Sequence, residues 1–483
     1  MGQQVVPVFQ DMRLLSGRAR KRTNQGDMNQ NIFREYDIRG IVDVDLTEDS
    51  VSRLALAIGS FFVSNGAKRI AIGYDARASS PRFAELLTVG LTASGCDIVQ
   101  IGMVTTPVLY HTVFTKPVDG GVMITGSHNP PDHNGFKICL GRSALFGEEI
   151  QEIRKIAESG DFVTGNGNVT EVSVIPGYCS DLVNRLKMGP RRLKVVVDAG
   201  NGMGGVTAVP IFRELGVELV ELYTDPDPTF PNHHADPTVA ENLNDLIAAV
   251  HDSAADVGIA FDGDGDRIGV VDNTGKIIWG DELMVLFARS VLSENPGSVV
   301  IAEVKCSQTL FDEIERAGGV PIMWKAGHSI IKAKMKETGA VLAGEMSGHI
   351  FFADRFYGFD DAAYAGARLL EILSNTAQAL SALFDDLPKT FSTPELRIPC
   401  PDEAKFAVVK QIADHFAHYH GVNTIDGARI DFPDGWGLVR PSNTQAILVL
   451  RFEAASADSL AEIRSIVETK TLEVIHEATG IRS

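Results

Sequence analysis

Three aspartates alternate with glycines in the stretch FDGDGDR, at positions 262, 264 and 266. Three carboxylates within five residues repel one another strongly unless a cation neutralises them. Glycine lets the backbone bend so that alternate aspartate side chains converge, and hard oxygen ligands suit Mg²⁺ or Ca²⁺. An EF-hand is excluded, because Arg267 stands where that loop needs glycine and Asn273 where it needs glutamate. The stretch therefore predicts a cation site formed by Asp262, Asp264 and Asp266, with a solvated acidic turn as the alternative.

A second polar stretch, TGSHNPPDHNGFK, follows an apolar run that reads as a strand. It predicts a tight turn that leaves Ser127 exposed, with donors for an anion from His128, Asn129 and Lys137. A nucleophile elbow needs glycine at position 129, so an α/β-hydrolase is disfavoured. Mg²⁺ normally completes its shell with phosphate or water. A phosphate carried on Ser127 would join this stretch to the aspartates, whereas a turn or helix-cap serine is the alternative.

Two further stretches carry groups that bind polar ligands. In LAGEMSGHIFF, Glu345, Ser347 and His349 alternate, and a carboxylate and a hydroxyl can hydrogen-bond neighbouring sugar hydroxyls. In GWGLVRPSNTQ, Arg440 begins a short donor-rich loop typical of phosphate binding; the other donors of this loop are Ser442, Asn443 and Thr444. A surface turn or cap is the alternative for each stretch. His328 carries a weaker signal, for which a structural role is an equal alternative.

A dinucleotide fingerprint competes with this interpretation. DAGNGMGG matches G-x-G-x-x-G at Gly200, Gly202 and Gly205, and Glu221 lies about twenty residues further on. An NAD-linked dehydrogenase is therefore one alternative, although the other motifs do not need NAD. A phosphosugar sensor that binds without turnover is a non-enzymatic alternative. No P-loop motif occurs, so an ATP-driven kinase of that class is unsupported.

Three segments repeat the order apolar strand, polar loop, amphipathic helix, glycine, apolar strand, at 69–102, 194–223 and 298–327. Such repeats are typical of βαβ units with buried strands, and ligands of such units lie beyond the carboxyl ends of the strands. A Pro-rich linker, DLPKTFSTPELRIPCPDE, precedes a predicted helix at 405–419 and a strand in AILVLRFEA. The expected fold class is α/β, with three related α/β domains and a C-terminal α+β domain. The expected boundaries are a disordered tail at 1–30 and domains at 31–179, 180–280, 281–388 and 389–483.

Composition limits the partners of the 483-residue chain. The net charge of −19 argues against general binding to nucleic acid or to an anionic membrane. No apolar run approaches the roughly 18 residues of a membrane span. The five cysteines are scattered and form no CxxC pair, which fits the reducing cytosol and predicts a cytoplasmic protein.

The motifs together resemble a known family. In chain order they closely resemble the α-D-phosphohexomutases, within them the bacterial phosphomannomutase/phosphoglucomutase group, from about Phe33 to the end. The likeness rests on FREYDIRG (33–40), GYDARASSP (73–81), TGSHNPPDHNGFK, DGDGDR, VKCSQ (304–308), GEMSGH (344–349) and RPSNTQ (440–445).

This resemblance implies four domains around a central cleft and a phosphoserine enzyme. The implied reaction interconverts hexose 1-phosphate and hexose 6-phosphate of mannose, glucose or both, with glucose 1,6-bisphosphate or mannose 1,6-bisphosphate as intermediate and activator. It implies a monomer or weak homo-oligomer whose partner is a small phosphosugar. Ser127 would carry the phosphate, and that phosphate would hold Mg²⁺ together with the three aspartates. The other implied catalytic residues are Arg39, His128, Lys137 and Arg267. The implied substrate contacts are Tyr36, Lys305, His328, Glu345, Ser347, His349, Arg440, Ser442, Asn443 and Thr444.

Overall fold

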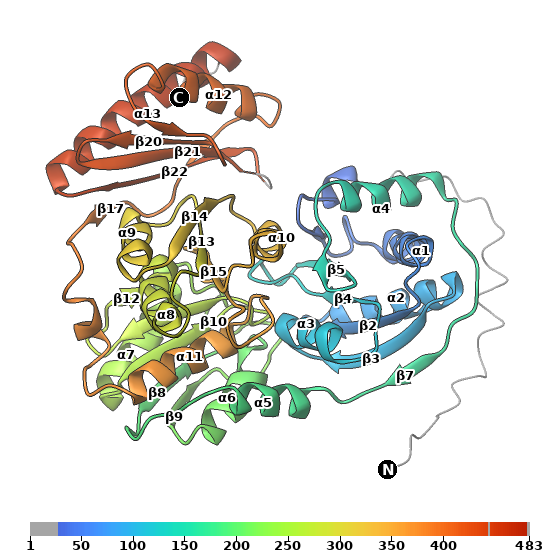
Figure 1. Cartoon of the computed structure of the whole chain (residues 1–483). Coiled ribbons are helices and arrows are strands. Elements are labelled where there is room, and N and C mark those ends of the chain that lie inside the picture. The colour runs from blue at the N-terminus through green and yellow to red at the C-terminus, as the bar shows by residue number, and fades with distance from the viewer. Residues whose placement is uncertain (1–27, 443–444, 481–483) are drawn as a thin grey trace.

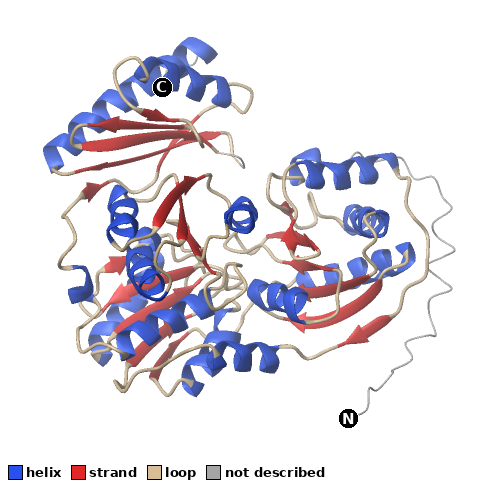
Figure 2. Ribbon diagram, viewed as in Figure 1, coloured by secondary structure: helices blue, strands red, loops and turns tan. Residues whose placement is uncertain are grey.

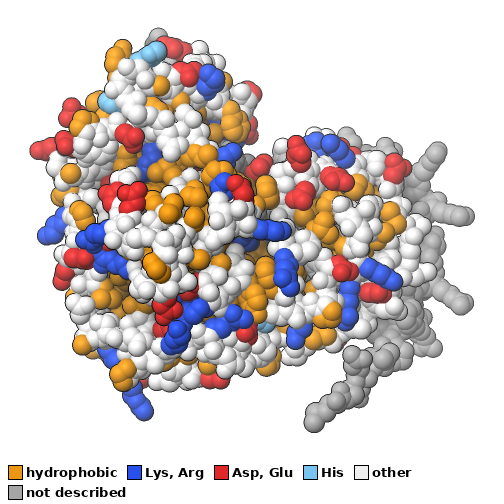
Figure 3. Space-filling model, in the orientation of Figure 1, with side chains coloured by type: hydrophobic (Ala, Val, Ile, Leu, Met, Phe, Trp, Pro, Cys, Tyr) orange, Lys and Arg blue, Asp and Glu red, His pale blue; other side chains and the backbone are white. Residues whose placement is uncertain are grey.

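The computed structural model describes residues 28–442 and 445–480. Three α/β domains and a C-terminal domain in which helices lie on one face of a sheet make up this part (Figure 1, Figure 2). The predicted fold class is confirmed. On the face drawn in Figure 3, the surface is notched between the first domain and the C-terminal domain. Most of the predicted tail lies outside the described residues, and Met28 packs against the core of the first domain.

The first domain is built on a sheet with the strand order β1-β5-β4-β2-β3-β7, and β6 pairs with β5. Its central strands β2, β3 and β4 are parallel, whereas β5 runs antiparallel to β4 and β1. The strands are β1 (Ile38–Ile41), β2 (Arg69–Tyr74), β3 (Asp97–Met103), β4 (Gly120–Ile124), β5 (His133–Leu140), β6 (Ser143–Ala144) and β7 (Val169–Glu171). The helices are η1 (Gln30–Ile32), α1 (Glu48–Ser64), α2 (Ser80–Ser94), α3 (Thr106–Thr115) and α4 (Glu148–Ser159).

The second domain has the strand order β12-β11-β10-β8-β9. Its strands are β8 (Lys194–Asp198), β9 (Glu218–Leu222), β10 (Val257–Phe261), β11 (Ile268–Asp272) and β12 (Ile277–Ile278). Its helices are α5 (Ile175–Asn184), α6 (Gly204–Glu214), η2 (Ala240–Leu243) and α7 (Asn244–Ser253). Strands β10 and β11 are entirely buried and antiparallel, and the turn between them is the aspartate stretch.

The third domain has the strand order β14-β13-β15-β16. Its strands are β13 (Val299–Glu303), β14 (Val320–Trp324), β15 (Leu342–Gly344) and β16 (Ile350–Phe352). Its helices are α8 (Gly280–Glu294), α9 (Gln308–Arg316), α10 (His328–Thr338), α11 (Ala362–Ser374) and η3 (Ser381–Phe384). Each predicted strand–helix–strand repeat is therefore present, as β2-α2-β3, β8-α6-β9 and β13-α9-β14.

The C-terminal sheet has the order β17-β22-β21-β20-β19, with β18 also paired to β22. Its strands are β17 (Phe391–Ser392), β18 (Leu396–Pro399), β19 (Val422–Asn423), β20 (Ala428–Phe432), β21 (Gly435–Pro441) and β22 (Ile447–Ala454). Two helices, α12 (Lys405–Phe416) and α13 (Ala457–Thr479), pack on it (Figure 1). The helix predicted over 405–419 is thus present and ends at Phe416.

The apolar core is divided unequally among the domains. One cluster of buried side chains, from Ala71 to Leu380, includes residues of the first three domains, and the first domain has a further cluster of its own, from Ile32 to Ala157. The C-terminal domain has a separate core, and a small cluster of Val304, Trp436 and Leu438 joins it to the third domain. Between residues 28 and 442 and between 445 and 480, no helix combines the length and apolar character that a membrane crossing requires.

Candidate active site

Ser127 lies on the turn that follows strand β4. Its backbone has a φ of 49°, in the left-handed region that costs an L-residue roughly 1 kcal/mol or more. The predicted exposure of this serine is wrong, because the residue is only 3% exposed. The aspartate turn of the second domain covers it. Gly263 approaches so closely that a Cβ there would lie 2.3 Å from the Ser127 carbonyl oxygen.

The serine and aspartate loops are joined by side-chain hydrogen bonds. Ser127 Oγ donates to Asp262 Oδ2 at 2.9 Å and lies 3.1 Å from His128 Nδ1. The other oxygen of Asp262 accepts three backbone amides, at 3.1 Å each, which hold the turn closed; they belong to Gly265, Asp266 and Arg267. Residues 135 positions apart therefore meet at one point.

Lys137 neutralises the other two aspartates. Its Nζ lies 2.7 Å from Asp264 Oδ2 and 2.5 Å from Asp266 Oδ2. Burial opposes the charged ammonium, but the attraction of Asp264 and Asp266 outweighs it and raises the pKa of Lys137 above the ordinary lysine value. Burial, reinforced by Asp266 and Asp264, raises the pKa of Asp262 well above its usual range. Lys137 is therefore held between two buried carboxylates in this arrangement.

The aspartate group fits a divalent cation. One oxygen from each of the three aspartates lies within 4.8 Å of the others, and all three residues are fully buried. Asp264 Oδ1 and Asp266 Oδ1 accept no hydrogen bond from the described residues. Buried carboxylate oxygens without partners are costly, and a divalent cation ligated by hard oxygen atoms would satisfy them.

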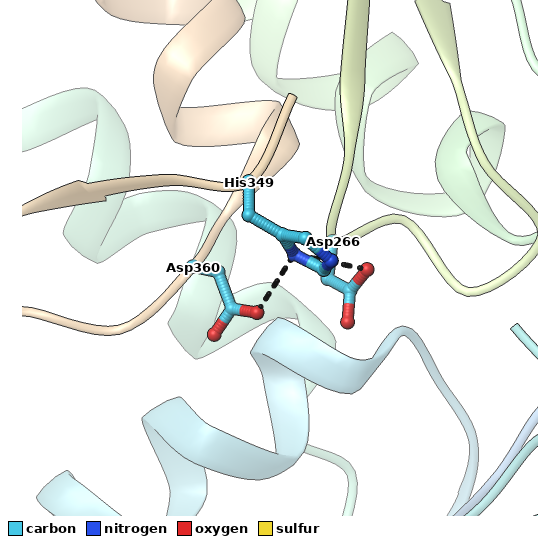
Figure 4. A group of neighbouring side chains, drawn as sticks. All are labelled: Asp266, His349 and Asp360. Atoms are coloured by element: carbon cyan, nitrogen blue, oxygen red, sulfur yellow. Dashed lines mark ion pairs between the residues drawn. The ribbon is translucent and has the colours of Figure 1, made fainter. Parts of the chain in front are cut away.

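A second group of metal-ligand type, Asp266, His349 and Asp360, lies beside the first (Figure 4). His349 Nε2 accepts a hydrogen bond from Arg267 Nε at 2.9 Å. The ring proton of neutral His349 must then be on Nδ1, which lies 3.0 Å from Asp360 Oδ2 and 3.6 Å from Asp266 Oδ1. A protonated ring nitrogen cannot ligate a metal. In this tautomer Nδ1 of His349 is not a ligand for a cation, which disfavours a second cation site here.

The predicted sugar loop lies in the third domain, next to the N-terminus of α10. Glu345 Oε1 accepts the amide of Gly327 at 2.6 Å. The ring of His328 stacks on that of His349, with centroids 5.5 Å apart. Ser347 is half-buried on the same turn. The structure thus brings Glu345, Ser347, His328 and His349 together.

The sugar loop is also attached to the aspartate turn through the backbone. The amide of Ile268, the first residue of β11, donates to the carbonyl of Gly348 at 3.0 Å. Gly348 has a φ of 89°, and a Cβ there would lie 2.2 Å from the Ile268 carbonyl oxygen. Only glycine fits this crossing.

Two other predicted residues, Tyr36 and Lys305, lie at domain junctions, and Arg39 lies in the first domain. Tyr36 of the first domain donates its hydroxyl to the carbonyl of Ala326 in the third, at 3.0 Å. Arg39 pairs with Asp37. Lys305 Nζ lies 3.3 Å from Glu395 Oε2, at the start of the C-terminal domain.

The predicted phosphate loop faces the same junction from the C-terminal domain. Arg440 Nη2 lies 3.0 Å from Asp426 Oδ2, and the same oxygen accepts the amide of Ala326 at 3.1 Å. Ser442 Oγ accepts the amide of Gln445 at 3.1 Å. The predicted ligands Asn443 and Thr444 lie outside the described residues.

In the structure, the glycine fingerprint contacts the aspartate turn of the same domain. The amide of Met203, just before α6, donates to the carbonyl of Gly263 at 2.9 Å. A Cβ at Gly202 would lie 2.9 Å from the Gly263 Cα atom. The aspartate turn therefore fills the place beside the helix N-terminus where a pyrophosphate would bind, which opposes the dehydrogenase alternative.

Sequence reasoning missed several residues that contact the site. Thr106 donates to Asp264 Oδ2 at 2.5 Å, and His234 contacts the carbonyl of His128. Asp360 faces His349, and Arg77 binds the serine loop. Arg77 stands in the quoted motif GYDARASSP, so its place after a strand was a usable signal. The other three have no such local signal.

Comparison with known proteins places this site in a family. The models of the phosphoglucomutase/phosphomannomutase alpha/beta/alpha domains I, II and III match residues 30–164, 176–275 and 279–391, and the model of the C-terminal domain matches 395–470. The Pseudomonas aeruginosa phosphomannomutase/phosphoglucomutase is 48% identical over 90% of this chain and 94% of its own length.

Solved structures agree with the family models. A phosphoglucomutase/phosphomannomutase family protein from Burkholderia thailandensis is 44% identical with a TM-score of 0.89, over 94% of this chain and 99% of that chain. A variant of an Aspergillus fumigatus N-acetylphosphoglucosamine mutase, in complex with glucose 1,6-bisphosphate, shares the fold alone, at 13% identity and a TM-score of 0.60 over 95% of this chain and 97% of that chain. With four domain models in order and close relatives over nearly the whole length, the chain belongs to the phosphoglucomutase/phosphomannomutase family.

Proposed function

We propose that this protein interconverts hexose 1-phosphate and hexose 6-phosphate, of mannose, glucose or both, through a phosphorylated Ser127. Membership of the family and the name of the P. aeruginosa relative support the reaction. One observation carries the mechanism: Ser127 Oγ lies 2.9 Å from Asp262, beside two further aspartates that have unpartnered buried oxygens.

In the proposed first step, the bond between phosphorus and Ser127 Oγ breaks while a bond forms from phosphorus to the free hydroxyl oxygen of the bound sugar phosphate, and the hydroxyl proton is transferred to Ser127 Oγ. Such transfers depend on positioning and charge stabilisation more than on covalent chemistry. The product is a hexose 1,6-bisphosphate. It reorients so that its other phosphoryl group returns to the serine, which restores the enzyme.

Mg²⁺ would be held by Asp262, Asp264, Asp266 and the phosphate on Ser127, and when bound it supplies positive charge to the phosphoryl group in transfer. Lys137 and Arg267 add fixed positive charge beside the same serine. Burial, reinforced by Arg267 and Arg39, lowers the pKa of His128 well below the ordinary histidine value. A neutral His128 can hydrogen-bond Ser127 without adding charge.

The substrate would be held from both ends. We propose that Glu345, Ser347, His328 and His349 bind sugar hydroxyls. The phosphate that is not being transferred would lie among donors from three domains: Tyr36, Arg39, Lys305, Arg440, Ser442, Asn443 and Thr444. Since all the loops belong to one chain, a monomer would suffice for activity.

The decisive experiment is a coupled assay with mannose 1-phosphate and glucose 1-phosphate. It is run with and without Mg²⁺ and with and without glucose 1,6-bisphosphate. The proposal expects turnover that requires Mg²⁺ and is stimulated by the bisphosphate, together with one phosphoryl group on the intact protein by mass spectrometry. Absence of turnover with both sugars, or full activity in a chelator, would contradict it.

A further inference from the structure

Arg77 lies beneath the serine loop and is 1% exposed. Its Nη2 donates to the carbonyls of Ser127 at 2.8 Å and Asn129 at 2.6 Å. Its Nη1 donates to the carbonyls of Pro130 at 2.5 Å and His133 at 2.9 Å. Four carbonyl groups of one seven-residue loop therefore accept from a single guanidinium group.

The amides of the serine loop satisfy these carbonyls only in part: the carbonyl of Pro130 accepts the amide of His133 at 3.0 Å, whereas among the described residues no backbone amide donates to the carbonyls of Ser127 and Asn129. Pro130 and Pro131 have no N–H groups to donate. Buried carbonyls without partners are costly, so an external donor is needed at this place. The planar guanidinium offers five N–H groups in a fixed arrangement, which suits several acceptors better than the point charge of lysine.

The guanidinium is itself held in place. Its Nε lies 3.2 Å from Asp75 Oδ2, the oxygen that also accepts the amide of Gly126. A Cβ at Gly126 would lie 2.4 Å from the Arg77 Cζ atom, so the group packs directly against the turn. The other oxygen of Asp75 accepts the Ser80 hydroxyl at 2.6 Å. These contacts tie the serine loop to the end of strand β2.

We propose that Arg77 is a positioning residue for phosphoryl transfer. It holds the backbone of residues 127–133 so that Ser127, in its left-handed conformation, keeps Oγ directed at the three aspartates. The Ser127 carbonyl is fixed between Arg77 on one side and Gly263 on the other. Without the guanidinium we expect the chain to fold, but Ser127 Oγ to lose its fixed position relative to the three aspartates. This inference rests on the proposed role of Ser127.

The test compares Arg77→Lys with Arg368→Lys. Arg368 is 2% exposed and ion-paired to Asp354 in the third domain, away from the serine loop, so it controls for loss of a buried guanidinium. For Arg77→Lys we expect kcat to fall about 100-fold with KM changed less than about threefold, because misplacement of a reacting group by about 1 Å costs this much. Amides of residues 126–134 should exchange hydrogen faster, while exchange in the other domains is unchanged. Arg368→Lys should keep the parental kcat.

Three results would overturn the proposal: a folded Arg77→Lys with parental kcat, parental exchange at 126–134, or a loss of kcat that only follows the folded fraction. If Arg77→Lys does not fold, Gly126→Ala decides, because its Cβ displaces the guanidinium without removing it. A parental kcat in Gly126→Ala would overturn the inference.

The phosphate content of the parent, measured by intact mass, separates the two proposals. A parent that is active without phosphoserine contradicts the proposed function, whereas the hydrogen-exchange result tests the role of Arg77 independently.

Discussion

The serine–aspartate centre and the phosphate loop of the C-terminal domain are held in different ways. At the centre, loops of the first and second domains share buried hydrogen bonds and a continuous apolar core. The phosphate loop belongs to a domain with a separate core. That domain meets the third through a small apolar cluster and polar contacts such as Arg451–Asp281, at 3.0 Å.

This difference matches the demands of the proposed reaction. The transferred phosphoryl group needs one fixed geometry, and the first two domains supply it. The other phosphate changes position when the bisphosphate reorients, so its binding loop benefits from a domain that can shift as a body. Changes at the centre should therefore act on kcat, and changes at the phosphate loop on KM.

The largest expected effect is that of Ser127→Ala. Removal of the phosphate carrier should lower kcat at least about 10³-fold, as loss of a covalent nucleophile does elsewhere, and should remove the added phosphoryl mass. Circular dichroism and the melting temperature should stay close to the parent. Ser143→Ala, at an exposed serine of the same domain, serves as the control. Near-parental turnover in Ser127→Ala would contradict the central role of this residue.

Asp264→Asn should have the next largest effect. It removes one carboxylate from the proposed cation site, so we expect the Mg²⁺ concentration for half-maximal activity to rise at least tenfold and kcat to fall about 100-fold. Calorimetric titration with Mg²⁺ measures binding independently of turnover. Asp272→Asn is the matched control, because Asp272 is a buried carboxylate on β11 that binds turn amides. Identical Mg²⁺ dependence in Asp264→Asn and the parent would exclude Asp264 as a ligand.

The pH dependence of stability tests whether the second and third domains unfold together. Burial raises the pKa of Asp361 to about 7, although the Tyr178 hydroxyl and the Tyr364 amide hydrogen-bond it. The unfolded value is about 3.9, so the native state holds a proton that the unfolded state releases. The stabilisation of the native state by this protonated carboxyl group is complete below pH 4 and is lost as the pH rises through 7.

Asp361→Asn should remove that dependence, which amounts to about 2 kcal/mol between pH 5 and 7. Calorimetric unfolding of parent and variant measures it. Because the hydrogen bond between Tyr178 and Asp361 joins α5 of the second domain to the third domain, the change should occur in the unfolding transition of these two domains. A pH-dependent change confined to the unfolding transition of the C-terminal domain would disprove the separation of its core from the core of the other domains.

Arg440→Lys should have the smallest effect. Lysine keeps the charge but loses the two-pronged hydrogen bonding of the guanidinium, so we expect KM to rise about tenfold with kcat within threefold. Arg464→Lys on the exposed face of α13 is the control. If kcat falls as much as KM rises, the proposed phosphate loop takes part in the chemical step.

Much of the architecture could be predicted from local patterns. The strand–helix–strand repeats follow from the spacing of apolar residues, and the glycines of DGDGDR mark a turn between two buried strands. The burial of Ser127 could not be predicted in this way, because it depends on Gly263, which is distant in sequence. The contact between Asp360 and His349 depends on how a loop of the third domain folds back. Such features arise from packing between segments, on which local composition carries no information.

The close approach of Gly348 to the backbone of Ile268 limits which sequence changes relatives of this protein can accept. An insertion or a bulkier residue in GEMSGH would push β11 away and disturb the aspartates that precede it. Changes in the proposed sugar contacts of this loop are therefore expected at side chains such as Ser347, with loop length kept constant.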